Sequence, residues 1–186
     1  MSDRIYDPFE SPLHLSTTYL FTGPVKTRTV RPLIEWVMSF NLLEKEDRPD
    51  LLKIVVSSLG GDVSNCFAAV DVLLGSAIPI HTVGLGGLAS CGLTLFMCGS
   101  KRIVAPHTLI TSHQYSGGSD GKHHELLAER AAQDWTHQAL IDLYCKQTRQ
   151  NDIYVGPTFF GPSDRHFSAQ EAMDTGLAHE ISKNFY

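Results

Sequence analysis

LLKIVVSSLGG, residues 51–61, decides the class of fold. Its apolar run is interrupted only by Lys53 and ends at a pair of glycines. This pattern predicts a strand that is buried on both faces and is followed by a tight turn. From Ser64 to Leu74 the apolar side chains then recur at helical spacing. A strand, a glycine turn and a helix in direct succession are typical of a domain built on a parallel sheet.

The same alternation continues along the chain in both directions. Further strands are expected at residues 17–22, 80–83, 102–104 and 108–111, and further helices at residues 30–42, 93–98 and 122–147. Because the connections are short, we predict an α/β fold with a largely parallel sheet. The chain has 186 residues, so a single domain over residues 1–186 is expected, with a short N-terminal segment at residues 1–16.

The helix expected at residues 122–147 is longer than one sheet of this size requires. An apolar stripe recurs along it at every fourth residue: Leu127, Ala131, Trp135, Ala139 and Leu143. A flexible glycine- and serine-rich segment, residues 116–121, precedes it. We therefore expect part of this helix to project from the domain and to contact another subunit.

Ser90 lies in a context suited to a nucleophile. It follows the glycine pair Gly86-Gly87, where a turn is expected, and precedes an apolar helical run over residues 93–98. A serine at that place has the free N–H groups of a helix N-terminus beside it, and these can stabilise a developing oxyanion. Taken alone, such a serine is more often a plain helix N-cap.

Two further residues complete a set for acyl chemistry. His113 ends the strand-like run at residues 108–111, and Asp164 precedes the helix signature that starts at Ser168. Serine becomes a nucleophile near neutral pH when a base takes its proton and a carboxylate orients that base. The capping box of Ser168 and Glu171 concerns helix stability and is no sign of catalysis.

Composition excludes several other functions. The formal net charge is −5, with no dense Lys/Arg stripe, which argues against a nucleic-acid partner. No apolar run approaches the roughly 20 residues of a membrane span, and the N-terminus does not have the pattern of a signal peptide. The adjacent His123 and His124 point to different helix faces, so we expect no metal site there. The four cysteines, Cys66, Cys91, Cys98 and Cys145, are expected to be small buried side chains in a reducing, cytoplasmic location.

Four motifs of the chain resemble those of the Clp protease proteolytic subunit family. They are Ala89-Ser90-Cys91-Gly92, Ser112-His113-Gln114, the segment from Ser163 to Ala172, and the closing pair Gly176-Leu177. They occur in the family's order and at similar distances, between about Tyr19 and Ile181. Gly60-Gly61 also stands where that family has a glycine pair after a proline.

The resemblance implies a role for each of these residues. Ser90 is expected to be the nucleophile, His113 the general base and Asp164 the residue that orients it. The backbone N–H groups of Gly61 and Cys91 are expected to form the oxyanion hole. A Cys91 thiol nucleophile remains the less favoured alternative.

The resemblance also implies the fold and the assembly. The fold is expected to be a ClpP/crotonase-like ββα superhelix, with residues 117–147 as a projecting handle. Subunits of this kind form seven-membered rings that stack and enclose a chamber for unfolded polypeptides or peptides. No cofactor is expected in the subunit itself, because ATP is used only by a partner ATPase of the Clp type.

Several positions depart from the family pattern. Val55 and Ile103 stand where aromatic residues commonly dock the ATPase, and Pro162-Ser163 replaces an acid–arginine pair at the contact between rings. The axial loop near the N-terminus is expected to be missing, and residues 154–161 form an unusual insertion. These departures suggest altered gating and altered ring pairing.

Two alternatives to a serine endopeptidase therefore stay open. The first is a non-catalytic or regulatory subunit that assembles with other Clp rings. The second is a crotonase-like acyl-CoA enzyme, which shares the class of fold and the oxyanion chemistry but does not need a Ser/His/Asp set.

Overall fold

The computed structural model describes residues 17–185. The segment 1–16, including the expected loss of an axial loop, lies outside the described residues. The strands are β1 (Thr18–Thr22), β2 (Leu52–Ser58), β3 (Ile80–Ala89), β4 (Lys101–Val104), β5 (Leu109–Ser112), β6 (Arg165–Phe167) and β7 (Glu180–Ile181). The helices are α1 (Thr27–Asn41), α2 (Val63–Leu74), α3 (Cys91–Met97), α4 (His123–Thr148), α5 (Asp152–Phe159) and α6 (Ala169–Asp174), with a 3₁₀ turn, η3, at Lys45–Asp47.

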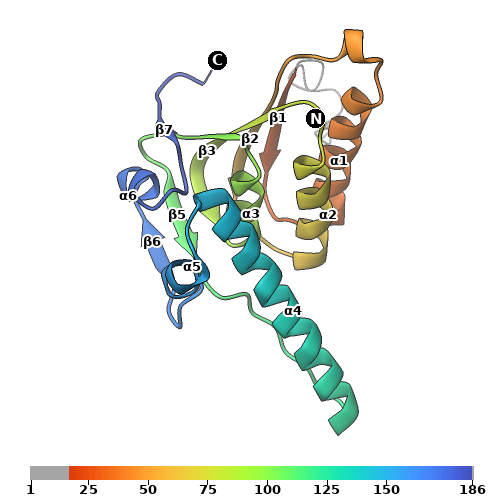
Figure 1. The fold of residues 1–186 in the computed structure, drawn as a ribbon, viewed down its shortest axis with the longest axis vertical. Helices are drawn as coiled ribbons and strands as arrows, with labels where there is room; N and C mark the ends of the chain where they lie inside the picture. Colours follow the sequence, from red (N-terminus) through yellow and green to blue (C-terminus); the bar gives the residue numbers. More distant parts are fainter. Residues whose placement is uncertain (1–16, 186) are drawn as a thin grey trace, which may run out of the picture.

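The sheet has the parallel arrangement that the alternation predicts. Its main path runs β1-β2-β3-β4-β7, and β5 and β6 extend from β3. Every strand pair is parallel except β5 with β6. In Figure 1, α1 and α2 lie together beside the sheet, whereas α5 and α6 lie at its opposite side. The predicted α/β class is therefore confirmed.

Strand β2 differs from its prediction in one respect. Its residues alternate regularly between buried and half-buried, so only one face is fully enclosed. The half-buried Lys53 belongs to the second face, where its Nζ donates a hydrogen bond to the carbonyl oxygen of Phe185 at 2.6 Å. The expectation of burial on both faces is wrong, because the C-terminal segment covers that second face only in part.

Strand β3 is longer than predicted and changes partner along its length. Residues 81–84 pair with β4, whereas residues 87–89 pair with β5. Between the two halves, Gly86 has a φ of 63°, which glycine adopts without steric penalty. The expected turn at Gly86-Gly87 is therefore a bulge within the strand, and β3 continues to Ala89.

Helix α3 is buried along its whole length. A Cβ atom on its second residue, Gly92, would lie 2.2 Å from the carbonyl oxygen of Ser58. The glycine therefore lets α3 pack directly against the end of β2. This close approach fixes the position of the residues just before the helix.

Arg102 on β4 is buried and joins the ends of three helices. Its guanidinium donates to the carbonyl oxygens of Gly99 after α3, Gln147 in the last turn of α4, and Gly176 and Leu177 after α6. It also donates to the side-chain oxygen of Gln147 at 3.2 Å. Burial lowers the pKa of Arg102 to about 10, so the side chain stays charged near neutral pH. Unpaired carbonyls at helix C-termini attract such a cation.

Helix α4 confirms the predicted long helix. It leaves the body of the protein at its N-terminal half, as Figure 1 shows, and its last turns are anchored by the buried Leu140 and Tyr144. In the N-terminal half of α4, the side chains of Leu127 and Trp135 are 59% and 67% exposed, and one edge contact joins the ring of Trp135 to that of Phe67 on α2. These apolar side chains have room to contact another chain.

Helix α5 was not predicted, because residues 154–161 include Gly156 and Pro157. The helix nevertheless forms, since the side chain of Asn151 accepts a hydrogen bond from the N–H of Tyr154 at 2.9 Å and caps its start. Asn151 is the sequence signal that could have indicated this helix.

We expect Arg102→Met to lower the free energy of unfolding by about 3 kcal/mol or more, because it leaves several buried carbonyl oxygens without a donor. Arg102→Lys should lower the free energy of unfolding nearly as much, since one ammonium group cannot reach all three helix ends. Urea unfolding measures both. The matched control is Arg31→Lys at an exposed ion pair with Glu35, which should change stability by less than about 0.5 kcal/mol. Equal stability of the two lysine variants would contradict the role of Arg102.

Candidate active site

Ser90 joins the end of β3 to the start of α3 in an unusual backbone conformation. Its φ is 51° and its ψ is −130°, and Ser90 and Arg149 are the non-glycine residues of the described chain with positive φ. Such a conformation costs free energy and is found most often at functional sites. Ser90 occupies the N-cap position, yet its side chain makes no capping hydrogen bond. The interpretation of Ser90 as a plain helix cap is therefore not supported.

His113 comes directly after β5 and lies close to Ser90. The parallel register of β3 and β5 places Ala89 beside Thr111, and the Ser90 N–H donates to the carbonyl oxygen of Thr111 at 3.3 Å. Both Ser90 and His113 line one cavity of about 20 Å³, together with Thr94, Tyr144 and Phe160. The tertiary structure thus brings together two of the three residues of the expected triad.

The imidazole of His113 is oriented by a backbone carbonyl. Its Nδ1 is 2.5 Å from the carbonyl oxygen of Gln114. A carbonyl oxygen accepts, so Nδ1 carries the proton and the neutral ring has its free lone pair on Nε2. This is the tautomer that a general base for serine requires.

Asp164 is exposed and does not contact His113. The antiparallel ladder of β5 and β6 pairs Ser112 with Arg165, so continuing it by one step sets Asp164 opposite His113. Within residues 17–185, however, no hydrogen bond or ion pair joins the two side chains. The third residue of the expected triad therefore lies next to the site without a hydrogen bond to His113.

Gly60 and Gly61 are held against Ser90 by close backbone packing. A Cβ on Gly60, whose φ is +99°, would lie 2.6 Å from the Cβ of Ser90. The N–H of Val25 donates to the carbonyl oxygen of Gly60, and the N–H of Asp62 donates to that of Val25, both at 2.8 Å. The glycine pair is thereby clamped between Val25 and the start of α3.

The two expected oxyanion donors differ in their surroundings. Cys91 is the first residue of α3, and its N–H has no hydrogen-bond acceptor in the part of the chain that the structure describes. Gly61 contacts the Cys91 thiol, whose Sγ donates to the carbonyl oxygen of Gly61 at 3.4 Å. The structure therefore gathers both backbone segments at Ser90.

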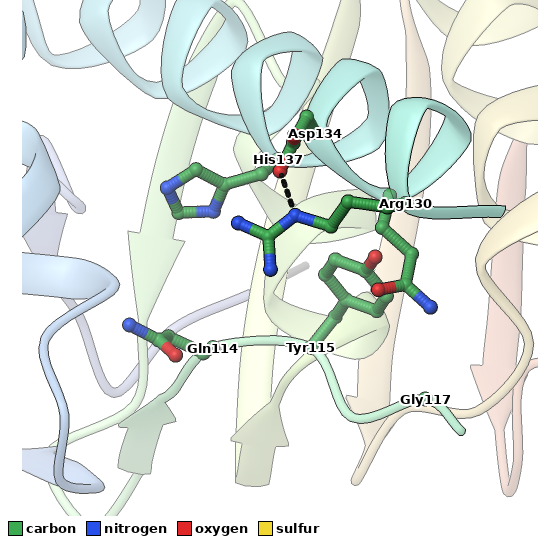
Figure 2. A pocket seen from close by; sticks show the side chains of 7 residues that line it. Gln114, Tyr115, Gly117, Arg130, Asp134 and His137 are labelled. Atoms are coloured by element: carbon green, nitrogen blue, oxygen red, sulfur yellow. Dashed lines mark ion pairs between the residues drawn. The ribbon is translucent and has the colours of Figure 1, made fainter. Parts of the chain in front are cut away.

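A larger polar pocket adjoins the Ser90–His113 cavity, and Figure 2 shows it. It has a volume of about 290 Å³ and lies between α4 and the extended segment after His113. Tyr115 lines both spaces, and the ring of His137 in the larger one contacts that of Phe160 in the smaller one, with centroids 5.9 Å apart. An ion pair of Arg130 and Asp134, at 2.9 Å, lies on the helix side of this pocket (Figure 2).

An apolar hollow lies on the other side of the glycine pair. Its volume is about 470 Å³, and its lining includes Pro24, Leu59, Gly60 and Gly87. Leu59 is 76% exposed. Because Gly60 lines this hollow and also abuts Ser90, only one residue separates the hollow from the serine.

Sequence reasoning missed the wall of the cavity. The Tyr144 hydroxyl lies 3.4 Å from Oγ1 of Thr94, and burial raises the pKa of Tyr144, so it stays protonated. Thr94 is four residues after Ser90 in a helical run, which could have pointed to it. No sequence signal connects Tyr144 or Phe160 with a serine so distant in the chain.

From the sequence, neither a metal site nor a membrane span is expected. Within residues 17–185, no three His, Cys, Asp or Glu side chains gather closely enough to hold a metal ion. His123 and His124 are exposed at the start of α4. None of the helices in the described part of the chain is long and apolar enough to span a bilayer.

Comparison with known proteins gives one consistent result. The family model of Clp protease matches residues 3–185. The chain is 32% identical over 147 residues to the ATP-dependent Clp protease proteolytic subunit 2 of Thermobifida fusca, covering 77% of this chain and 70% of that protein. It is 34% identical over 146 residues to the protein of the same name from Nocardia farcinica, covering 76% and 70%.

A solved structure shares the fold. A mutant of ClpP1 from Listeria monocytogenes superposes with a TM-score of 0.80, covers 92% of this chain and 94% of its own, and is 22% identical. The expected ClpP-like superhelix is thereby confirmed.

The packing at Gly60 predicts a sharp effect of one methyl group. We expect Gly60→Ala to lower the free energy of unfolding by about 2–3 kcal/mol, because the new Cβ meets Ser90 and the positive φ strains alanine. The matched control is Gly118→Ala, where nothing lies within 4 Å and φ is not positive. Urea unfolding compares the two, and a Gly60→Ala protein as stable as the control would contradict the described packing.

Proposed function

The chain belongs to the Clp protease family, and we propose that it is a serine endopeptidase that hydrolyses peptides and unfolded proteins inside a ring-shaped chamber. The observation that carries this proposal is the shared cavity of Ser90 and His113, with the imidazole held in the tautomer of a base. The strained backbone at Ser90 supports the same conclusion.

In the proposed reaction, Oγ of Ser90 attacks the carbonyl carbon of the peptide bond. Nε2 of His113 takes the hydroxyl proton and then delivers it to the leaving amine. The N–H groups of Gly61 and Cys91 stabilise the oxyanion, a contribution of typically about 10²–10³ in rate for one donor. Water then attacks the acyl-enzyme while Nε2 of His113 takes a proton from it, and that proton passes to Oγ of Ser90 as the carboxylic acid product leaves.

Asp164 takes part only after a local rearrangement. The carbonyl of Gln114 holds Nδ1 of His113 in the present structure, and Asp164 lies one ladder step away on the neighbouring strand. A carboxylate in place of that carbonyl stabilises the imidazolium of the transition state more strongly, because it carries a full charge. We propose that assembly of the ring exchanges the two partners of Nδ1.

The spaces beside the serine suggest how a substrate lies. The cavity of about 20 Å³ is too small for a side chain, so it must widen when the peptide bond to be cleaved enters it. An extended peptide can run from the apolar hollow at Leu59 to the polar pocket at Arg130 and His137. This arrangement favours an apolar side chain on one side of the cleaved bond and a polar one on the other.

One observation favours a second candidate function. Because Asp164 and His113 are not in contact, the chain could serve as a non-catalytic subunit that assembles with other Clp rings. Turnover by the assembled wild-type protein decides between the two functions.

The assembly, location and partner of the protein follow from the same proposal. We propose a cytoplasmic homo-oligomer in stacked seven-membered rings that needs no cofactor of its own, with a Clp-type ATPase as a partner. Val55 is half-buried and Ile103 is 9% exposed. These side chains therefore offer little apolar surface for docking of the ATPase.

We expect Ser90→Ala and His113→Ala each to lower the cleavage rate of a fluorogenic peptide by about 10⁴-fold or more, because the triad acts as a unit. Asp164→Asn should lower it by orders of magnitude as well. Cys91→Ala keeps its backbone N–H and should retain measurable turnover. Rates are compared at equal oligomer mass, measured by light scattering.

Labelling with a fluorophosphonate provides the control for the nucleophile. Wild-type protein should carry the label on Ser90, and Ser90→Ala should carry none. If Cys91→Ala is inactive while Ser90→Ala retains activity, the thiol is the nucleophile and the assignment is wrong. An Asp164→Asn protein with the wild-type rate would remove Asp164 from the triad.

The exposed apolar residues of α4 predict which substitutions should dissociate the oligomer. Leu127→Glu combined with Trp135→Glu should shift the oligomer to smaller species, because charges replace apolar contacts between chains. Lys146→Glu, on an exposed face at the other end of α4, is the control and should leave the size unchanged. Light scattering at micromolar concentration measures this, and an unchanged mass for the double variant would exclude this face from the contact.

A further inference from the structure

Two cysteines lie in contact directly behind the serine. Cys91 is the first residue of α3, and Cys66 is the fourth residue of α2. The Cys66 thiol donates to the carbonyl oxygen of Cys91 at 3.6 Å, so it lies against the residue that follows Ser90. Neither sulfur has a part in the proposed hydrolysis, which uses only the backbone of Cys91.

The two thiols differ chemically. The neighbouring Cys66 side chain, together with the backbone of Gly61, lowers the pKa of Cys91. The neighbouring Cys91 side chain, together with burial, raises the pKa of Cys66 well above its usual value. Because the thiolate is the reactive form, Cys91 is the sulfur that reacts first and Cys66 the one that follows.

The two thiols also differ in access. Cys91 lines the cavity that it shares with Ser90 and His113, whereas Cys66 does not. A cavity of about 20 Å³ has room for a single molecule of the size of water. Hydrogen peroxide is only slightly larger than water, whereas a disulfide such as oxidised glutathione is far too large to enter.

We propose that Cys91 and Cys66 form a peroxide-sensitive site whose oxidation to a disulfide inhibits Ser90. This inference rests on the proposed function, because the inhibited group is the proposed nucleophile. Two observations support the site: the Cys66 thiol contacts the backbone of Cys91, and Cys91 lines the catalytic cavity.

The reaction consumes one molecule of peroxide. The Cys91 thiolate attacks an oxygen atom of hydrogen peroxide, the O–O bond breaks, and the leaving hydroxide takes a proton to become water. The resulting sulfenic acid on Cys91 is then attacked by the Cys66 thiol. An S–S bond forms and a second water leaves, so two thiols are oxidised and one peroxide is reduced to two waters.

The disulfide would change the site through the backbone next to Ser90. At present the Cys91 sulfur donates to the carbonyl oxygen of Gly61. A bond to Cys66 draws the Cys91 sulfur away from Gly61. The backbone N–H groups of Cys91 and Gly61 are the proposed oxyanion donors. The donors then no longer converge, and loss of one such donor typically costs about 10²–10³ in rate.

The test treats the assembled protein with hydrogen peroxide, blocks the remaining thiols under denaturing conditions, and maps the peptides by mass spectrometry. We expect a Cys66–Cys91 disulfide, with the mass lower by two hydrogen atoms. Peptide cleavage should fall at least about tenfold and recover with dithiothreitol. Oxidised glutathione should form no mixed disulfide on Cys91.

Two variants separate this proposal from general oxidation. Cys66→Ala should cleave peptides normally before treatment, but its oxidised Cys91 should proceed to sulfinic acid, so dithiothreitol no longer restores activity. Cys66→Ser serves if the alanine protein does not fold. Cys145→Ala removes a half-buried thiol of α4 that does not line the cavity of Ser90, and it should behave as the wild type.

Each result supports or overturns the proposal. Oxidation of Cys145 without a Cys66–Cys91 disulfide overturns it, and so does full activity with that disulfide in place. The mapping does not depend on peptidase activity. A Cys66–Cys91 disulfide in a protein that cleaves no peptide would therefore support the redox site and count against the proposed function.

Discussion

Burial of the Arg102 guanidinium is the constraint on which the rest of the structure depends. A charged group without a carboxylate partner in a protein interior is costly unless every donor is used. Here its hydrogen bonds go to the chain after α3, to the last turn of α4 and to the chain after α6, so that cost is offset by satisfying carbonyl oxygens that would otherwise lack donors. The three helices are therefore fixed relative to β4 and to one another. One of them, α3, begins at the proposed nucleophile, and another, α4, supplies the wall of the cavity and the projecting half.

The change of partner along β3 connects this framework with the site. Because its first half pairs with β4 and its second half with β5, the end of β3 departs from β4 at the bulge around Gly86, while Leu88 still pairs with Ser58 of β2. That departure brings the serine at its end beside the histidine at the end of β5. The packing of Gly92 against Ser58 then holds the helix that follows. A site assembled in this way depends on backbone geometry, and it leaves side chains such as Asp164 free to exchange partners.

In this site the cavity is small, the histidine is held by a carbonyl oxygen, and the carboxylate of Asp164 is exposed and does not bond to the histidine. The thiol pair behind the serine adds a second way to alter the same backbone. The position of Asp164 affects His113, and the oxidation state of Cys91 affects the proposed oxyanion donors beside Ser90. Assembly of the ring would thus complete the hydrogen bonds of the site, and oxidation would disrupt them.

The sequence by itself determined the order of the elements, because apolar periodicity and glycine positions are local properties. The strands at residues 17–22, 102–104 and 108–111 and the long helix before Thr148 were predicted to within a few residues. The four motifs identified the family for the same reason, since their order and spacing lie in the chain.

Only the tertiary structure decided that β3 continues through Gly86, that α5 forms around Pro157, that Arg102 is buried, and that Asp164 and His113 are apart. Each of these depends on contacts between residues far apart in sequence. Their free energies arise from packing and hydrogen-bond satisfaction, which no local pattern records.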